Sequence, residues 1–240
     1  MDTRRILSTS LLLGATLMFA SQSPEDIYKR SVKVLSVDKI KFQVKSLMQS
    51  KNYKQEQIFT LARYTDAENS SSLVCFLYPK NIKGTAILIK NESTLVYFPS
   101  LGRSRLVPKE DEDNEAFGLG LSFAEIQNNT SKLKNLGEIQ KGSRSYYQLE
   151  KETKKQKIIY LIEKKSMIIQ EMKIYQNTQL IKKVIIDEVA LFHNKKIITK
   201  WHIVDYKKDK TTTYSVNKKS ITSSFSKRIF KRSAISHCRS

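Results

Sequence analysis

Hydrophobic and polar residues alternate along most of the chain from residue 39 onward. Ile40, Phe42 and Val44 are separated by Lys41 and Gln43, which is the period of two typical of a half-buried β-strand. Similar runs recur roughly every ten residues, with short polar turns between them. The alternation predicts strands at 39–45, 57–64, 73–78, 85–90, 95–98, 103–107, 136–140, 145–150, 157–163, 168–175, 181–189, 197–204 and 211–216.

Three segments break this alternation and have the residue spacing of helices. In the first, residues 24–37, Ser23 is a candidate N-cap and Pro24 suits the first turn. The second lies at 122–127, after a Gly-rich turn. The third, at 224–232, gathers its aromatic and aliphatic residues on one helical stripe. These segments predict short helices that pack against the strands.

The order of the elements indicates an α+β, mainly β, protein. Successive strands joined by short turns, without intervening helices, are typical of an antiparallel meander that curls into a barrel or a deep half-barrel. We therefore predict a single curved antiparallel sheet, an incomplete barrel, with covering helices. No linker or internal repeat interrupts the pattern, so one domain is expected.

The first residues have the features of an export signal. Two arginines precede an apolar stretch that is shorter than the roughly 20 apolar residues of a membrane span, and Ala20 is a plausible cleavage position. We predict a signal peptide at 1–20, a folded domain at 21–232 and a flexible tail at 233–240. An uncleaved N-terminal anchor is the alternative, and both place the domain outside the cytoplasm.

The chain is strongly basic, with 43 Lys and Arg residues against 23 Asp and Glu and a formal net charge of +20. Such a surplus raises affinity for polyanions and anionic membrane surfaces. The basic residues are scattered, and lysine on strand faces also protects sheet edges from aggregation. No helix-turn-helix, zinc spacing or aromatic RNA-binding motif accompanies them. We therefore expect no nucleic-acid partner and only transient contact with membrane surfaces.

The two cysteines, Cys75 and Cys238, are far apart in the sequence. An exported domain permits disulfides. A cysteine in a strand and one in a tail nevertheless make a poor pair, and their spacing fits no metal site. We interpret Cys75 as a small buried hydrophobic residue.

No group of residues has the pattern of a catalytic or metal site. His193, His202 and His237 lack Cys, Asp or Glu at metal-ligand spacing. The acidic run at 110–115 lacks the spacing of a calcium loop and is interpreted as solvated. We expect no enzymatic activity, no metal and no cofactor.

A curved sheet offers instead an apolar concave face, and a small exported β-domain without an enzyme motif often works by enclosing a ligand. Arg103 and Arg105 lie two apart on one strand face. At the mouth of a cavity they would bind a carbonyl of a covering helix or a lipid phosphate, and the alternative is a solvated basic strand. Each apolar candidate has an ordinary place in the core as its alternative. The candidate lining residues are Phe42, Val44, Ile58, Phe76, Ile87, Leu88, Tyr97, Phe98, Ile159, Leu161, Met172 and Ile174.

Short motifs follow one another in a definite order between residues 75 and 126. An apolar strand ends in proline, Lys-Gly-Thr opens the next strand, an aromatic-proline corner and a two-arginine strand follow, and a Gly-rich turn precedes a helix start. The residues that carry the order are Pro79, Gly84, Thr85, Tyr97, Pro99, Arg103, Arg105, Phe117, Gly118 and Ile126. This order resembles the outer-membrane lipoprotein-sorting family, the LolA-like periplasmic carriers, strongly over 75–126 and weakly over 24–232.

The resemblance implies a monomeric periplasmic carrier that hides the acyl chains of lipoproteins in a hydrophobic cavity and shuttles them towards the outer membrane. Residues 24–37, 116–127 and 224–232 would form a lid over the concave face. The implied partners are acylated lipoproteins or lipids, an inner-membrane lipoprotein-releasing complex and an outer-membrane acceptor. A carrier of free lipid or another apolar ligand, an envelope-stress regulatory sensor on the same fold and a cationic polyanion binder stay open as alternatives.

Overall fold

The computed structural model describes residues 22–66, 70–90, 93–111, 114–122, 132–152 and 156–238. In these residues the structure has one α-helix, α1 (Pro24–Val34), and thirteen strands in a single antiparallel sheet. Their order in the sheet is β6-β5-β4-β3-β2-β1-β13-β12-β11-β10-β9-β8-β7, so β6 and β7 are its edges. The strands are β1 Lys39–Ser50, β2 Lys54–Thr65, β3 Ser70–Tyr78, β4 Ala86–Lys90, β5 Ser93–Phe98, β6 Arg103–Leu106, β7 Leu133–Lys141, β8 Arg144–Glu152, β9 Lys157–Glu163, β10 Ile169–Gln176, β11 Gln179–Phe192, β12 Lys195–Asp205 and β13 Lys210–Val216.

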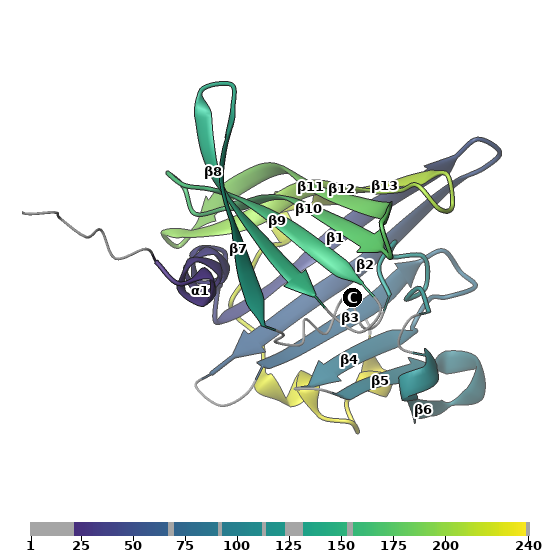
Figure 1. Cartoon of the computed structure of the whole chain (residues 1–240). Helices are drawn as coiled ribbons and strands as arrows, with labels where there is room; N and C mark the ends of the chain where they lie inside the picture. The colour runs from purple at the N-terminus through teal and green to yellow at the C-terminus, as the bar shows by residue number, and fades with distance from the viewer. Residues whose placement is uncertain are drawn as a thin grey trace, which may run out of the picture.

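Each strand overlaps one segment that the alternation predicts, and the predicted fold class is confirmed. Figure 1 shows the sheet bent into an open half-barrel, with α1 beside β7 and the C-terminal segment, in yellow, next to β3 and β4. The predicted helix at 122–127 falls almost wholly on residues 123–131, outside the described residues.

The helix α1 begins where the sequence predicts. The Ser23 hydroxyl accepts a hydrogen bond from the backbone N–H of Asp26 at 3.1 Å and so caps the helix. The buried side chain of Ile27 is 1% exposed and packs on β8 and β9. The ring of Tyr28 meets that of Tyr160 edge-on, with centroids 5.2 Å apart. The helix therefore covers the concave face over β7–β9, at one end of the sheet.

Strand register defines which residues share this concave face. Phe59 of β2 lies opposite Val44 of β1 and Phe76 of β3, and all three belong to one buried cluster. The same face continues to β10 and β9, where Met172 lies opposite Tyr160. Because side chains alternate between faces along a strand, the apolar concave surface runs from β4 to β8 without interruption.

The C-terminal segment, residues 224–238, covers the outer face of the sheet. Phe230 and Ile235 are 7% and 1% exposed and pack with Leu73 and Leu88 in a second cluster. The predicted helix is reduced to 3-10 turns at Lys227–Phe230 and Ile235–His237. The implied role of this segment in a lid over the concave face is wrong, because its apolar partners point to the opposite side.

Cys75 and Cys238 form a disulfide, which corrects the interpretation of Cys75 as an unpaired buried residue. Their Cα atoms lie 5.7 Å apart, within the range that a disulfide spans. Cys75 points to the outer face of β3, and the packing of Ile235 brings the end of the chain to it. The residues expected to be a flexible tail are therefore fixed to the sheet as far as residue 238.

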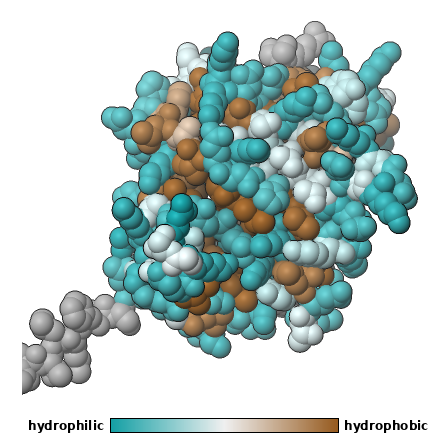
Figure 2. All heavy atoms as spheres, turned by 90° about the horizontal axis from the view of Figure 1, so that it is seen from above, coloured by the Kyte–Doolittle hydropathy of each residue, from teal (hydrophilic) through white to brown (hydrophobic). Residues whose placement is uncertain are grey.

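The molecular surface is mixed in character. Figure 2 shows hydrophilic residues spread over the upper face, with several patches of hydrophobic residues exposed between them. No helix in the part of the chain that the structure describes is long and apolar enough to cross a membrane.

Candidate functional site

Residues 115–122, which we call the plug, follow β6 and precede β7 in the chain. They lie across the concave face of the sheet. A β-bridge joins Glu115 to Ser122, and the backbone N–H of Ala116 donates to the carbonyl of Leu121 at 2.9 Å. These bonds close the segment on itself. The plug is thus a small loop of its own and adds no strand to the sheet.

Two glycines allow the plug backbone to lie directly on the sheet. Gly118 and Gly120 have φ angles of 78° and 66°, in the left-handed region that glycine adopts readily. A Cβ atom at Gly118 would come within 3.0 Å of Met48 Cε. One at Gly120 would lie 3.4 Å from Ile203 Cδ1 and 3.5 Å from Thr212 Oγ1. Larger residues here would push the plug away from the concave face.

The apolar side chains of the plug fill the concave face. The Phe117 ring packs against Phe76 and Phe98, with centroids 5.8 Å and 6.0 Å apart. Leu119 is 7% exposed, and Leu121 packs on the same cluster. The plug therefore occupies apolar surface that the sequence predicts to be available to a ligand.

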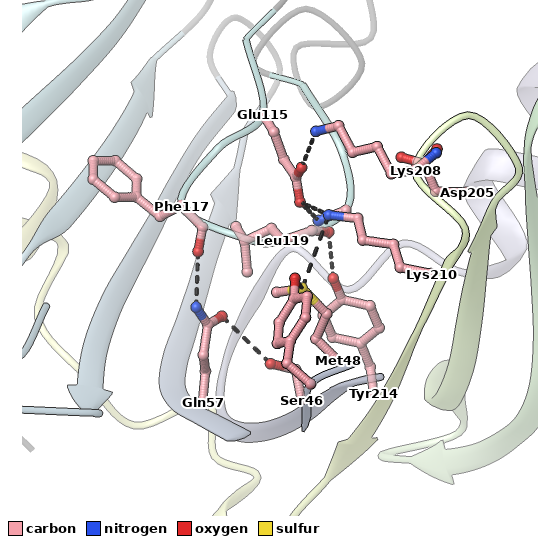
Figure 3. A network of polar contacts seen from close by, with 12 residues as sticks. Ser46, Met48, Gln57, Glu115, Phe117, Leu119, Asp205, Lys208, Lys210 and Tyr214 are labelled. Atoms are coloured by element: carbon pink, nitrogen blue, oxygen red, sulfur yellow. Dashed lines mark hydrogen bonds and ion pairs between the residues drawn. The ribbon is translucent and has the colours of Figure 1, made fainter. Parts of the chain in front are cut away.

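Two side chains of the sheet hold the plug backbone (Figure 3). Gln57 Nε2 donates to the carbonyl of Phe117 at 2.8 Å, and the Tyr214 hydroxyl donates to the carbonyl of Leu119. Tyr214 is 2% exposed and stacks on Trp201, with ring centroids 4.7 Å apart and planes 5° apart. Side chains, and not strand pairing, satisfy these plug carbonyls.

Glu115 fastens the plug through its carboxylate. Its Oε1 accepts from Lys210 Nζ at 2.5 Å and from the backbone N–H of Gly120 at 2.9 Å, and its Oε2 accepts from Lys208 Nζ. Burial alone would raise the pKa of Glu115, but the hydrogen bonds and charges of the two lysines outweigh burial and lower the pKa to about 2. The carboxylate is therefore ionised throughout the neutral range.

The two lysines that hold Glu115 differ in exposure. The Lys208 side chain is 50% exposed, whereas that of Lys210 is 6% exposed. Lys210 points from β13 to the plug, and its Nζ lies 3.9 Å from Met48 Sδ (Figure 3). A buried cation without a counter-charge is costly. Lys210 therefore depends on the Glu115 carboxylate.

Further polar groups lie on the concave face. Thr212 is 1% exposed, and its Oγ1 has no hydrogen-bond partner among the described residues. Lys151 of β8 is 6% exposed, and burial lowers its pKa. It stands two residues after Leu149, which packs beneath α1, so it shares that face. The apolar surface thus includes a few buried cationic and hydroxyl groups.

Seven of the twelve predicted lining residues lie on this face. Six belong to the cluster that the plug covers, and the seventh follows Met172 at a spacing of two on β10. The structure therefore brings more than half of the predicted set together. The seven residues are Phe42, Val44, Phe76, Ile87, Phe98, Met172 and Ile174.

The other five predicted lining residues lie on the outer face, and their prediction as concave residues is wrong. Leu88 and Tyr97 pack under the C-terminal segment, while Ile58, Ile159 and Leu161 have the outward orientation in their strands. The physical reason is alternation, because consecutive strand residues cannot both point to one face.

Arg103 and Arg105 lie on the edge strand β6 and are exposed. They are opposite Phe98 and Val96 of β5, which belong to the concave cluster, so both arginines project from the concave side of the sheet edge. This position agrees with a place at a cavity mouth. Their contact with a ligand stays a prediction.

Two cavities in the described residues have no plug residue in their lining. One of about 600 Å³ is lined by Leu47, Thr211 and Thr213 of β1 and β13 and also by Asp205 and Lys210, so it reaches the lysine that holds the plug. Another of about 480 Å³ lies between β5 and the C-terminal segment, beside Tyr97 and Cys238. The concave face beneath the plug is thus filled by the protein itself, and access to it requires the plug to move.

The polar network around Glu115 was not predicted from the sequence. The interpretation of 110–115 as a solvated loop is wrong for Glu115, because its side chain is 16% exposed and paired with two lysines. One signal was present: Lys210, Thr212 and Tyr214 continue the alternation of β13 on its concave side. In the described part of the chain, no three His, Cys, Asp or Glu side chains are grouped to hold a metal.

Comparison with known proteins places the chain in a family. A family model described as "Uncharacterized protein" matches residues 68–237, more than half of the chain. The chain belongs to this family. No curated protein sequence matches it.

Solved structures share the fold at low sequence identity. A DUF1329 family protein from Desulfovibrio piger is 17% identical and aligns with a TM-score of 0.79, covering 88% of this chain and 96% of its own. A putative outer membrane lipoprotein-sorting protein domain from Vibrio parahaemolyticus is 11% identical and aligns with a TM-score of 0.79, covering 88% of this chain and 97% of its own. A LolA superfamily protein from Nitrosomonas europaea is 14% identical and aligns with a TM-score of 0.73, covering 88% of this chain and 98% of its own. The LolA-like resemblance is confirmed in the fold.

Proposed function

We propose that this chain is a periplasmic carrier that shields the acyl chains of lipoproteins, or of other lipids, on its concave face. Binding is non-covalent and involves no catalytic step. Residues 1–20 serve as the signal peptide, and the carrier domain runs from residue 21 through the C-terminal segment that the disulfide at Cys238 fixes to the sheet. An inner-membrane lipoprotein-releasing complex supplies the cargo, and an outer-membrane acceptor receives it.

The observation that carries the proposal is the way in which the concave face is closed. The plug is a self-contained loop, held to the described sheet by the side chains of Gln57, Tyr214 and Lys210. A ligand can take the place of Phe117 and Leu119 without breaking any hydrogen bond between strands. A separable cover over an apolar surface suits reversible loading and release.

The energetics of acyl chains require such a cover. Each buried CH₂ group is worth about 0.8 kcal/mol, so one chain of ordinary length represents roughly 12 kcal/mol. Free transfer of an acylated protein between membranes is therefore negligible. An apolar plug keeps the empty carrier soluble, because it covers the surface that the chains would otherwise cover.

The disulfide supports an exported carrier. A bond between Cys75 and Cys238 is typical of an oxidising compartment and is rare in the cytosol. The fold is also shared with a structure described as an outer membrane lipoprotein-sorting domain. Both observations favour a periplasmic place of action.

Extraction from membranes tests the proposal. The protein is incubated with inner-membrane vesicles that carry a tagged acylated lipoprotein, the vesicles are sedimented, and the lipoprotein in the supernatant is measured. We expect the carrier to release the acylated form and to release none of a variant that lacks the acylated cysteine and binds the vesicles through a fused transmembrane helix.

The outcomes separate cargo from mechanism. Release of phospholipid without lipoprotein would identify the cargo as free lipid and would still support the carrier mechanism. Release of neither, from vesicles of several compositions, would contradict the carrier function.

A further inference from the structure

We infer that the concave site takes an anionic amphiphile, whose negatively charged head replaces the Glu115 carboxylate while its hydrocarbon replaces the apolar side chains of the plug. The inference rests on the proposed carrier function and names the chemistry of its ligand. The head is a carboxylate or a phosphate, the two common anions that are joined directly to acyl lipids.

The first argument is the charge that the plug leaves behind. When the plug moves away, Glu115 withdraws from Lys208 and Lys210. Lys208 is half exposed and water can solvate it, but the Lys210 side chain is 6% exposed beneath the plug, and a ligand that takes the place of the plug would cover it again. Glu115 forms the ion pair with Lys210, while Asp205, which lies opposite Lys210 on β12, accepts from the backbone N–H of Lys208. A neutral ligand would leave this cation buried and unpaired, whereas an anionic head restores a charge-assisted hydrogen bond.

The second argument is a set of hydrogen-bond donors around the same point. Thr212 Oγ1 is buried and has no partner among the described residues even with the plug in place. Gln57 Nε2 and the Tyr214 hydroxyl donate to plug carbonyls and lose those acceptors when the plug leaves. Carboxylate, phosphate and ester oxygens are acceptors that these groups can bind, and a bare hydrocarbon offers none.

The third argument is that the charge and the apolar surface are adjacent. Glu115 Oε1 accepts from both Lys210 Nζ and the backbone N–H of Gly120, the residue after Leu119. The Leu119 side chain is buried in the concave cluster. The anion position therefore lies directly beside the hydrocarbon position, as the head and the first carbons of a fatty acid or an acidic phospholipid do.

Matched pairs of ligands test the inference on the full-length protein. The probes are dibromostearic acid against dibromostearyl alcohol, and dibrominated phosphatidic acid against the diacylglycerol with the same chains. Bromine quenches the fluorescence of Trp201, the single tryptophan, which lies in the concave cluster. Each probe is supplied from neutral phosphatidylcholine vesicles. We expect each anionic probe to bind about tenfold or more tightly than its neutral counterpart, and the two pairs distinguish a carboxylate from a phosphate head.

Variants locate the effect. Lys210→Met keeps the length of the side chain and removes its charge, so the preference for the anionic member of each pair should fall to less than about threefold. Glu115→Gln should tighten binding of the anionic probes, because the competing carboxylate is gone. Lys218→Met is the matched control: Lys218 pairs with Glu188, both side chains are about half exposed, and the preference should not change.

The outcomes distinguish the inference from the carrier function. Equal quenching by acid and alcohol, and by the two diacyl lipids, would overturn the anionic ligand and leave the carrier function standing. A preference that survives in Lys210→Met would also overturn the inference, because it would place the anion elsewhere. No saturable quenching of Trp201 by any probe would overturn both. If Lys210→Met does not fold, the comparison of matched probes on the natural chain still shows whether the site prefers an anionic ligand.

Discussion

Replacing Glu115 with glutamine tests the plug directly. Glu115→Gln removes the negative charge that binds Lys208 and Lys210 but preserves an oxygen that accepts from the backbone N–H of Gly120. The variant therefore isolates the electrostatic part of the attachment. The packing of Phe117 on the concave face is untouched.

The magnitude follows from the exposure of each pair. Hydrogen bonds to charged groups contribute about 1.5–3 kcal/mol, and exposed ion pairs about 0–1 kcal/mol. The Lys210 pair is nearly buried and the Lys208 pair is half exposed. We expect plug closure to weaken by about 2–3 kcal/mol, which raises the population of the open plug roughly 30- to 150-fold.

Amide hydrogen exchange measures this population. The backbone N–H groups of Ala116 and Leu119 are bonded within the plug. These few bonds do not hold so short a loop together in water once it leaves the sheet, so their protection should fall by the predicted factor. Exchange in β1 and β13 should not change. Glu188→Gln is the matched control, because it removes an exposed carboxylate that pairs with Lys218, and it should leave plug protection as it was. Unchanged protection in Glu115→Gln would refute the idea that ion pairs hold the plug.

Three further predictions follow from the same contacts. The pKa of Glu115 is lowered to about 2, so its ion pairs stabilise closure fully above the ordinary carboxyl pKa, and this stabilisation is lost as the pH falls from there towards about 2. Plug protection, corrected for intrinsic exchange, should therefore be constant from about pH 8 to about pH 5 and should decrease only in stronger acid. Loss of plug protection on mild acidification would contradict this assignment. Cys238→Ser should lower the free energy of unfolding by about 2–4 kcal/mol in urea titrations, and a reducing agent should lower the natural chain to the same value. Gly120→Ala should decrease plug protection because of its φ of 66° and the nearby sheet, whereas Gly142→Ala, at a φ of 58° with nothing within 4 Å, should not; equal effects of the two would show that close approach to the sheet is unimportant.

The strands were predictable because a local pattern determines them. A period of two marks a half-buried strand wherever one face is wet, and each of the thirteen predicted segments became a strand. The pairing of successive strands followed as well within β1–β6 and within β7–β13, since short turns join antiparallel neighbours. The pairing of β1 with β13, which leaves β6 and β7 at the edges, was not predicted. Cys238 was not predictable in this way: its pairing depends on how Ile235 packs on the outer face, a contact between segments 163 residues apart.

The candidate site was only half predictable for a related reason. Hydrophobicity alone does not tell the concave from the outer face where both are buried, so Ile87 and its neighbour Leu88 were both proposed and only Ile87 faces the plug. Strict use of alternation would have removed one of them. The pairing of Glu115 with Lys210 joins residues 95 positions apart, and no local pattern reports it.

Exchange of the plug amides with and without an acyl ligand tests the central claim most directly. The claim is that an acyl chain and the plug compete for one concave surface. Saturating dibromostearic acid should therefore quench Trp201 and, at the same concentrations, lower the protection of the Ala116 and Leu119 amides. Bound ligand with plug protection unchanged or increased would contradict the claim, because the chain would then lie elsewhere or on top of a closed plug.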